Sequence, residues 1–174
     1  HGEADRDERL HVYGQRVSLL EQARTTRQEA RVTQAVTMRD ELRRMKRVLR
    51  KLNYISADGV LTTKGQFACQ LNTGDELMVT DMIFEGVFND ITVEQSVALM
   101  SCFVFDAPSK DDSPPVVRGD FQASYERLRN IAKTIAEAKI EMKLDCDENE
   151  YVKKFNPGLM EVCWAWAAGK SFVE

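Results

Sequence analysis

The stretch that decides the fold is residues 73–105, TGDELMVTDMIFEGVFNDITVEQSVALMSCFVF. It contains two apolar segments joined by the short link EGVFND. Thr73 lies three residues before Glu76, and Thr92 lies three residues before Gln95, which is the spacing of a helix N-terminal capping box. Because apolar residues then cover more than one side of each segment, we expect two helices buried inside a helical bundle.

The composition is that of a globular protein with much exposed helix. The 174 residues are 43% hydrophobic and 30% charged, enough for one ordinary core. A net charge of −4 argues against a wholly basic nucleic-acid binder. Since no apolar run approaches the roughly 20 residues of a membrane span, we expect no membrane partner. The first residues, HGEADRDER, contain no Met and no signal segment, which suggests a fragment of a longer protein.

The chain offers few groups for catalysis or metal binding. Its four cysteines are widely spaced, without a CxxC pair, and most lie in apolar runs, so we expect buried, reduced thiols. Both histidines are near the N-terminus, which leaves a zinc site almost without ligands. The sequence contains no phosphate-binding glycine motif and no nucleophile–base or acid pair. We therefore predict no catalytic, cofactor-binding or metal-binding residues in this chain.

The N-terminal segment predicts a long helix with little to bury. Residues 7–37 are polar and contain no proline. An apolar stripe at Leu10, Tyr13, Val17 and Leu20 repeats every three or four residues and then thins. This pattern favours a projecting stalk or a coiled-coil arm that packs on one neighbour.

The next segment, residues 38–52, combines a stronger apolar face with a basic one. Its basic residues are Arg39, Arg43, Arg44, Lys46, Arg47, Arg50 and Lys51, opposed only by Asp40 and Glu41. This gives the segment a charge of +5 in a chain whose total is −4. Three interpretations fit: a solvated face whose long stems cover apolar surface, contacts with nucleic-acid phosphates, or a nuclear-import patch.

Residues 53–71 predict a short β-hairpin. Turn signals at Asp58-Gly59 and Lys64-Gly65 flank the β-prone sequence VLTT. A hairpin that follows a helix is the closing half of a winged-helix domain. Such domains serve as nucleic-acid binders and also as structural connectors.

The remaining sequence adds a loop and more bundle helices. Residues 106–119, DAPSKDDSPPVVRG, predict a surface loop. An apolar face then repeats from residue 120 to residue 142, as expected of a bundle helix. Asn156-Pro157 is a helix-start signal for the apolar segment GLMEVCWAWAAG, in which we expect both tryptophans to be packing residues. The fold class is therefore mainly α, with a projecting stalk helix, a winged-helix remnant with a short β-hairpin, and a C-terminal helical bundle.

Two long segments resemble one family. They are residues 40–105, which contain RVL, KG, GDEL, FEGVFND, EQ and SCFVF, and residues 151–172, YVKKFNPGLMEVCWAWAAGKSF. Together they are similar to the region that follows the arch insertion in superkiller-type DExH-box RNA helicases, and more to the nuclear exosome (TRAMP-complex) branch than to the cytoplasmic one. The resemblance covers residues 38–174.

The resemblance implies a domain assignment. Residues 1–37 would be the returning stalk helix of the arch, 38–72 the last helix and wing of a winged-helix domain, and 73–174 an incomplete C-terminal helical bundle. It implies an ATP-dependent RNA helicase of the nucleus and nucleolus that unwinds RNA and feeds it to the 3′–5′ exosome in RNA decay and rRNA processing. Its ATP and Mg²⁺ would be bound by motor domains outside this chain. The implied partners are single-stranded RNA, the RNA exosome and adaptor proteins.

The candidate RNA-contacting residues come partly from charge and partly from this resemblance. The basic residues expected to contact phosphates or a partner are Arg43, Arg44, Lys46 and Arg47. In the family, an acidic residue facing the RNA channel stands in a Gln-Glu pair after the SCF-aromatic segment. Here the pair is Asp106-Ala107, so the acid is shifted by one position and Asp106 is the candidate.

The alternative function is a non-enzymatic α-helical scaffold whose arm, residues 1–37, docks a partner protein. A free-standing winged-helix DNA binder is a third possibility, which the negative charge of the rest of the chain disfavours. An upstream P-loop and DExH box in the same reading frame would decide for the helicase.

Overall fold

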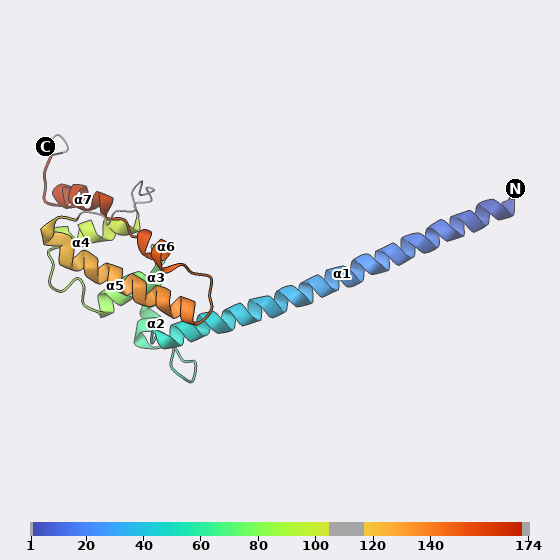
Figure 1. Cartoon of the computed structure of the whole chain (residues 1–174), viewed down its shortest axis with the longest axis horizontal. Helices are drawn as coiled ribbons and strands as arrows, with labels where there is room; N and C mark the ends of the chain where they lie inside the picture. The colour runs from blue at the N-terminus through green and yellow to red at the C-terminus, as the bar shows by residue number, and fades with distance from the viewer. Residues whose placement is uncertain (1, 105–116, 172–174) are drawn as a thin grey trace. The chain divides into compact units, whose positions relative to one another are not determined.

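The computed structural model describes residues 2–104 and 117–171, apart from the side chains of residues 2–5, 7 and 37. These residues are mainly helical and contain no named β-strand (Figure 1). The chain divides into two compact units, residues 1–43 and 44–174. The prediction of a mainly α fold is confirmed.

Helix α1 spans Gly2–Lys51, and its part up to residue 43 forms the first unit. The predicted helix over residues 7–37 is therefore confirmed. Its apolar stripe is exposed, with Leu10 58% and Tyr13 65% accessible. The helix has little to bury because polar residues occupy most of its surface.

The second unit begins with the last turns of α1 and adds shorter helices. These are α2 (Thr63–Ala68), α3 (Glu76–Phe84), α4 (Val93–Met100), the 3₁₀ turn η1 (Ser101–Phe103), α5 (Gly119–Glu141), α6 (Glu148–Lys153), the 3₁₀ turn η2 (Pro157–Leu159) and α7 (Met160–Ala167). Helix α4 packs against α7, and α5 packs against α3 and α6 (Figure 1). Among the described residues, none of the helices has the length and apolarity needed to cross a membrane.

The core lies where α3, α4 and α5 meet. Met78, Met82 and Leu99 are fully buried. They pack with a stripe on α5 that includes Leu128 and Ile135, as the three- and four-residue spacing predicted. Each such side chain contributes about 1.5–3 kcal/mol when it leaves water.

The predicted β-hairpin is wrong in its second half. Residues 63–68 form helix α2, and the antiparallel pairing is limited to one bridge between Ile55 and Leu61. Thr62 caps α2 by accepting a hydrogen bond from the Gly65 N–H at 3.1 Å. A capped helix therefore replaces the turn that Lys64-Gly65 had indicated.

The two capping predictions have different outcomes. At α4 the box is confirmed, because Gln95 N–H donates to Thr92 Oγ1 at 3.2 Å and Thr92 N–H donates to Gln95 Oε1 at 2.9 Å. At α3 the prediction of Thr73 is wrong, because Asp75 Oδ1 accepts from Met78 N–H at 3.0 Å. Asp is at least as good an N-cap as Thr, so Asp75, directly before the helix, caps it in place of Thr73.

The Asn156-Pro157 signal begins η2, which leads into α7, and Asn156 Oδ1 accepts from the Gly158 N–H at 2.9 Å. Trp164 packs edge-on against Phe121 with ring centroids 6.3 Å apart, as expected of a packing residue. Trp166 is 74% exposed among the described residues, so the packing role predicted for it is wrong here.

Candidate nucleic-acid interface

The basic residues at the end of α1 divide into two kinds in the second unit. Arg44 Nη1 donates to the Lys143 backbone oxygen at 2.8 Å, and Lys51 forms an ion pair with Glu141. Both contacts hold the last turns of α1 against the C-terminal end of α5. The Lys143 carbonyl lies two residues beyond the last residue of α5, so the Arg44 guanidinium fixes the turn that ends this helix.

Helix α5 ends in a left-handed turn at Lys143, the residue that Arg44 contacts. Lys143 adopts the left-handed conformation, with φ of 60°, and its N–H donates to the Ile140 oxygen at 2.9 Å. Leu144 N–H donates to the Lys139 oxygen at 3.0 Å. Glycine usually occupies such a position, so the sequence carried no visible stop signal here.

Lys46 and Arg47 are exposed and form no ion pair within the described part of the chain. Lys46 shares a face with Arg50, four residues later, opposite the buried Val48. Their ammonium and guanidinium groups are therefore available to a phosphate. Arg50 was not among the predicted contact residues, although its spacing from Lys46 could have indicated it.

The two other predicted residues stand apart from this group. Arg43 belongs to the first unit and pairs with Asp40 at 3.3 Å, with both side chains more than half exposed. Such a surface pair contributes little to stability, so it leaves Arg43 open to other anions. Asp106 lies outside the described residues.

A buried polar cluster near the end of α1 was not predicted from the sequence. Tyr54 is 2% exposed, and its hydroxyl lies within hydrogen-bond distance of the Asp81 carboxylate and, at 3.0 Å, of the Leu77 oxygen. Lys64 Nζ lies 2.6 Å from Asp81 Oδ1 and donates to the Leu52 oxygen at 3.0 Å. The Asp81 charge is thus paired and hydrogen-bonded, as a buried carboxylate requires.

Asp75, the N-cap of α3, accepts a hydrogen bond from a second tyrosine. Tyr151 donates to Asp75 Oδ2 at 2.7 Å while Asp75 Oδ1 caps α3. Lys139 Nζ lies 4.1 Å from the centre of the Tyr151 ring, a cation–π contact. The two pairs, Tyr54–Asp81 and Tyr151–Asp75, are here called the α3 clasps. They fix α3 to the loop after α1 and to α6.

The α3 clasps perturb their phenols in a consistent direction. Burial is the main cause that raises the pKa of Tyr54, followed by its hydrogen bond to Asp81. Burial also raises the pKa of Tyr151, followed by the negative charge of Asp75. Both tyrosines are therefore neutral donors at ordinary pH.

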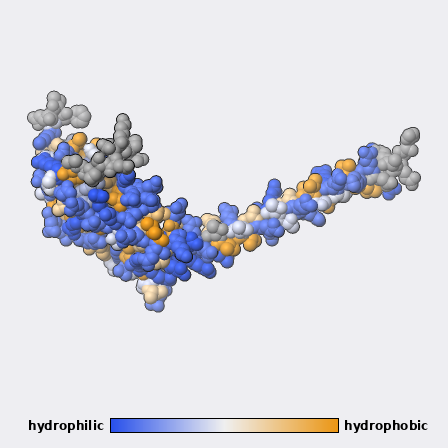
Figure 2. Space-filling model, viewed as in Figure 1, coloured by the Kyte–Doolittle hydropathy of each residue, from blue (hydrophilic) through white to orange (hydrophobic). Residues whose placement is uncertain are grey.

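The described residues offer little reactive chemistry. Burial raises the pKa of Cys102 to about 12, so its thiol is a poor nucleophile. No group of three or more His, Cys, Asp or Glu in the described part of the chain could hold a metal ion. The visible surface of the second unit is largely hydrophilic with scattered hydrophobic spots (Figure 2).

Comparison with known proteins gives a consistent result. Residues 58–174 match the model of the DSHCT (NUC185) domain. The whole chain is 36% identical to the ATP-dependent RNA helicase mtr4 of Schizosaccharomyces pombe, of which it covers 16%. It is 38% identical to the human exosome RNA helicase MTR4 over 149 residues. This aligned region is 86% of the chain and 14% of the human protein. Over 96% of its length it is 35% identical to DExH9 of Arabidopsis thaliana, of which it covers 17%. The chain thus spans about one sixth of the length of these relatives.

Proposed function

Because the chain belongs to the superkiller-type DExH-box RNA helicase family, whose DSHCT domain it carries over residues 58–174, we propose that it is a non-catalytic part of an ATP-dependent RNA helicase. The observation that carries the proposal is similarity along the whole chain to a named RNA helicase. The 174 residues contain no P-loop and no DExH box, so ATP and Mg²⁺ would bind elsewhere in the enzyme.

The proposed organisation follows the family. Residues 1–37 form the returning stalk helix of the arch, 38–72 the end of the winged-helix domain, and 73–174 the helical bundle. The division of the structure near residue 43 supports a separate stalk. The wing is reduced to the bridged turn and helix α2.

The proposed substrate is single-stranded RNA that the enzyme unwinds and delivers to the 3′–5′ exosome in the nucleus, with adaptor proteins as further partners. The name of the human relative, exosome RNA helicase, supports this assignment. RNA decay and rRNA processing are the processes that such delivery serves.

The basic end of α1 has two roles in this proposal. Lys46, Arg47 and Arg50 contact RNA phosphates, which adds affinity without sequence choice. Arg44 positions them, because its hydrogen bond to Lys143 fixes the helix that carries them. Arg43, on the first unit, is available to a phosphate or to a partner protein. The family resemblance makes Asp106 the candidate for the acidic residue of the RNA channel.

The test is RNA-stimulated ATP hydrolysis by the full-length enzyme. The Lys46→Glu/Arg47→Glu variant should require about tenfold more RNA for half-maximal stimulation, equivalent to about 1.4 kcal/mol of binding free energy. Lys133→Glu is the control, because Lys133 is an exposed lysine on α5 about two turns before Glu141, where the end of α1 makes its contact. Unchanged RNA dependence in the double variant would refute the phosphate contacts.

A non-enzymatic scaffold is the second candidate. The exposed apolar stripe of α1 in the first unit favours it, because such a stripe suits partner docking. A P-loop and a DExH box encoded upstream in the same reading frame would support the helicase, and their absence would support the scaffold.

A further inference from the structure

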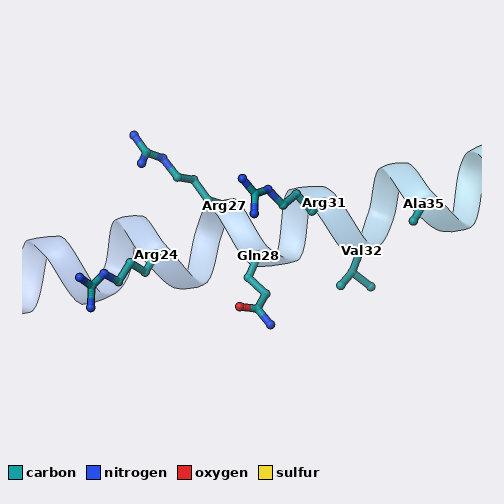
Figure 3. A pocket seen from close by; sticks show the side chains of 6 residues that line it. All are labelled: Arg24, Arg27, Gln28, Arg31, Val32 and Ala35. Carbon is teal, nitrogen blue, oxygen red and sulfur yellow. The ribbon is translucent and has the colours of Figure 1, made fainter.

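The basic side chains of α1 differ in what holds them in place. In the first unit, a hollow of about 620 Å³ is lined by residues of α1 alone, namely Arg24, Arg27, Gln28, Arg31, Val32 and Ala35. Arg27 and Gln28 extend from opposite sides of this helix (Figure 3). Because no second element of the described chain lines the hollow, its side chains are not fixed around a ligand. The last turns of α1, in the second unit, are instead held by several other elements.

Helix α1 ends at Lys51 in a compact backbone turn. Asn53 adopts the left-handed conformation, with φ of 62°, and its N–H donates to the Arg50 oxygen at 3.1 Å. The Tyr54 N–H donates to the Leu49 oxygen at 2.8 Å. These two bonds form a Schellman motif, which satisfies two of the last carbonyl groups of the helix. The carbonyl groups of the turn itself must find donors on other elements.

Helix α2 and its cap supply those donors. Thr62 Oγ1 donates to the Asn53 oxygen at 2.7 Å, and the Thr62 N–H donates to the Tyr54 oxygen at 3.0 Å. Lys64 Nζ donates to the Leu52 oxygen at 3.0 Å. Three consecutive carbonyl groups after the end of α1 are thus bonded by one short segment. The Leu52 carbonyl, nearest to the helix, is the one that Lys64 holds.

Lys64 also connects the end of α1 to α3. Its Nζ lies 2.6 Å from Asp81 Oδ1 and 4.6 Å from the centre of the Tyr54 ring. The Lys64 side chain is 20% exposed, and that of Asp81 is 4% exposed. An ammonium group surrounded by a carboxylate, a carbonyl oxygen and an aromatic face is held in one place. These partners leave the Lys64 ammonium group poorly placed to contact an RNA phosphate.

The residues proposed to contact RNA lie within two turns of this anchor. Lys46, Arg47 and Arg50 precede Leu52 on the exposed surface of α1. The other side of the helix is held by apolar packing, because Val48 is 3% and Leu52 8% exposed. Apolar packing is non-directional and lets a helix turn or slide slightly. A charge-assisted hydrogen bond to the Leu52 carbonyl is directional, so it fixes the rotation of α1 about its axis.

We propose that Lys64 is a positioning residue for the RNA-binding surface formed by Lys46, Arg47 and Arg50. Lys64 does not touch RNA. By holding the Leu52 carbonyl against Asp81, it fixes the direction in which the three basic side chains leave α1. This role rests on the phosphate contacts of the proposed function and adds a residue from another helix to that site.

The experiment measures RNA-stimulated ATP hydrolysis by the full-length enzyme that contains this chain. The Lys64→Met/Asp81→Asn variant removes the anchor, keeps the net charge and leaves no buried charge unpaired, since the new amide can still accept from Tyr54. It should need about fourfold more RNA for half-maximal stimulation, with an unchanged rate at saturating RNA, because a misplaced surface weakens binding.

Thermal unfolding of each variant checks the fold. Should the methionine variant fail to fold, Lys64→Gln/Asp81→Asn carries the same prediction. Its two amides can hydrogen-bond to each other, while the shorter side chain falls short of the Leu52 carbonyl.

A second background separates positioning from other roles. In the Lys46→Gln/Arg47→Gln/Arg50→Gln enzyme, the anchor has no phosphate-binding side chain left to position. Adding Lys64→Met/Asp81→Asn should therefore weaken the RNA dependence no further. A direct contact between Lys64 and RNA, or general damage to the fold, would weaken both enzymes by the same factor.

The matched control is Lys133→Met/Glu137→Gln, which makes similar chemical changes at two exposed positions of α5 and should leave the RNA dependence unchanged. Equal weakening of both enzymes by Lys64→Met/Asp81→Asn would overturn the positioning role. Unchanged RNA dependence of that variant in the wild-type background would also overturn it, and the phosphate contacts would stand if the triple variant is weakened. Unchanged RNA dependence of the triple variant would refute the phosphate contacts and the positioning role together.

Discussion

Gly65 lies so close to Tyr54 that a Cβ atom there would be 2.1 Å from the Tyr54 carbonyl oxygen. The backbone must move to relieve this overlap, so we expect Gly65→Ala to lower the free energy of unfolding by about 1–3 kcal/mol. Gly14→Ala is the control, because nothing lies within 4 Å of its added Cβ and Ala is the better helix former. Urea unfolding measures both, and equal stability of the Gly65 variant and the wild type would show that the packing is looser than described.

Because of the α3 clasps, the free energy of unfolding should depend on pH in the alkaline range. The folded-state pKa of Tyr54 and of Tyr151 is raised above 10.0, mainly by burial. The unfolded chain therefore releases these protons first as pH rises, so the contribution to stability is full below about pH 10 and is lost above it. In urea unfolding between pH 7 and 11, the Tyr54→Phe/Tyr151→Phe variant should lose less stability than the wild type.

The double variant should still lose some stability as pH rises, because Tyr125 remains and burial raises its pKa to about 12. At pH 7 the same double variant should be less stable, since the carboxylates of Asp81 and Asp75 each lose a donor. An identical pH dependence in the variant and the wild type would mean that the clasps do not form.

Sequence patterns identified the cap of α4 and the packing of Trp164, but they missed contacts whose partners are distant in the sequence. Thr92 and Gln95 form a local box that three-residue spacing reveals. Asp81 interrupts an apolar helix, which could have suggested a buried partner. Tertiary packing, however, decides that this partner is Tyr54, 27 residues earlier.

At the scale of elements, periodicity was the reliable signal. The apolar face of α5 predicted the buried side of that helix. The pattern of three- and four-residue steps extends over 23 residues, so single exceptions do not obscure it. The second half of the predicted hairpin was wrong because Val60 to Thr63 is too short for periodicity to distinguish a strand from a helix start. Gly65 was interpreted as a turn residue, although it serves close packing inside a helix.

The end of α5 gives a test at this scale. Lys143→Gly should raise the free energy of unfolding by up to about 1 kcal/mol, because glycine adopts the left-handed conformation without steric cost. Lys133→Gly, in the interior of the same helix, should lower it by about 1 kcal/mol. Thermal unfolding of the two variants should therefore move in opposite directions, and a shared decrease would rule out the strained end.

For the whole molecule, two sources of information were needed. Composition and spacing predicted a helical fold without catalytic groups, since these properties follow from the chain's own residues. RNA binding could not follow from them, because surface charge on a helix has several explanations. The family resemblance supplied the helicase, and similarity to helicases along the whole chain supports it.

The most direct test of the central claim is the salt dependence of RNA binding by the full-length enzyme. If Lys46 and Arg47 each contact a phosphate of single-stranded RNA, the slope of log K against log salt should become shallower by about 1.4 in the Lys46→Gln/Arg47→Gln variant. A Lys133→Gln variant should keep the wild-type slope. An unchanged slope in the double variant would contradict the placement of this chain along the RNA.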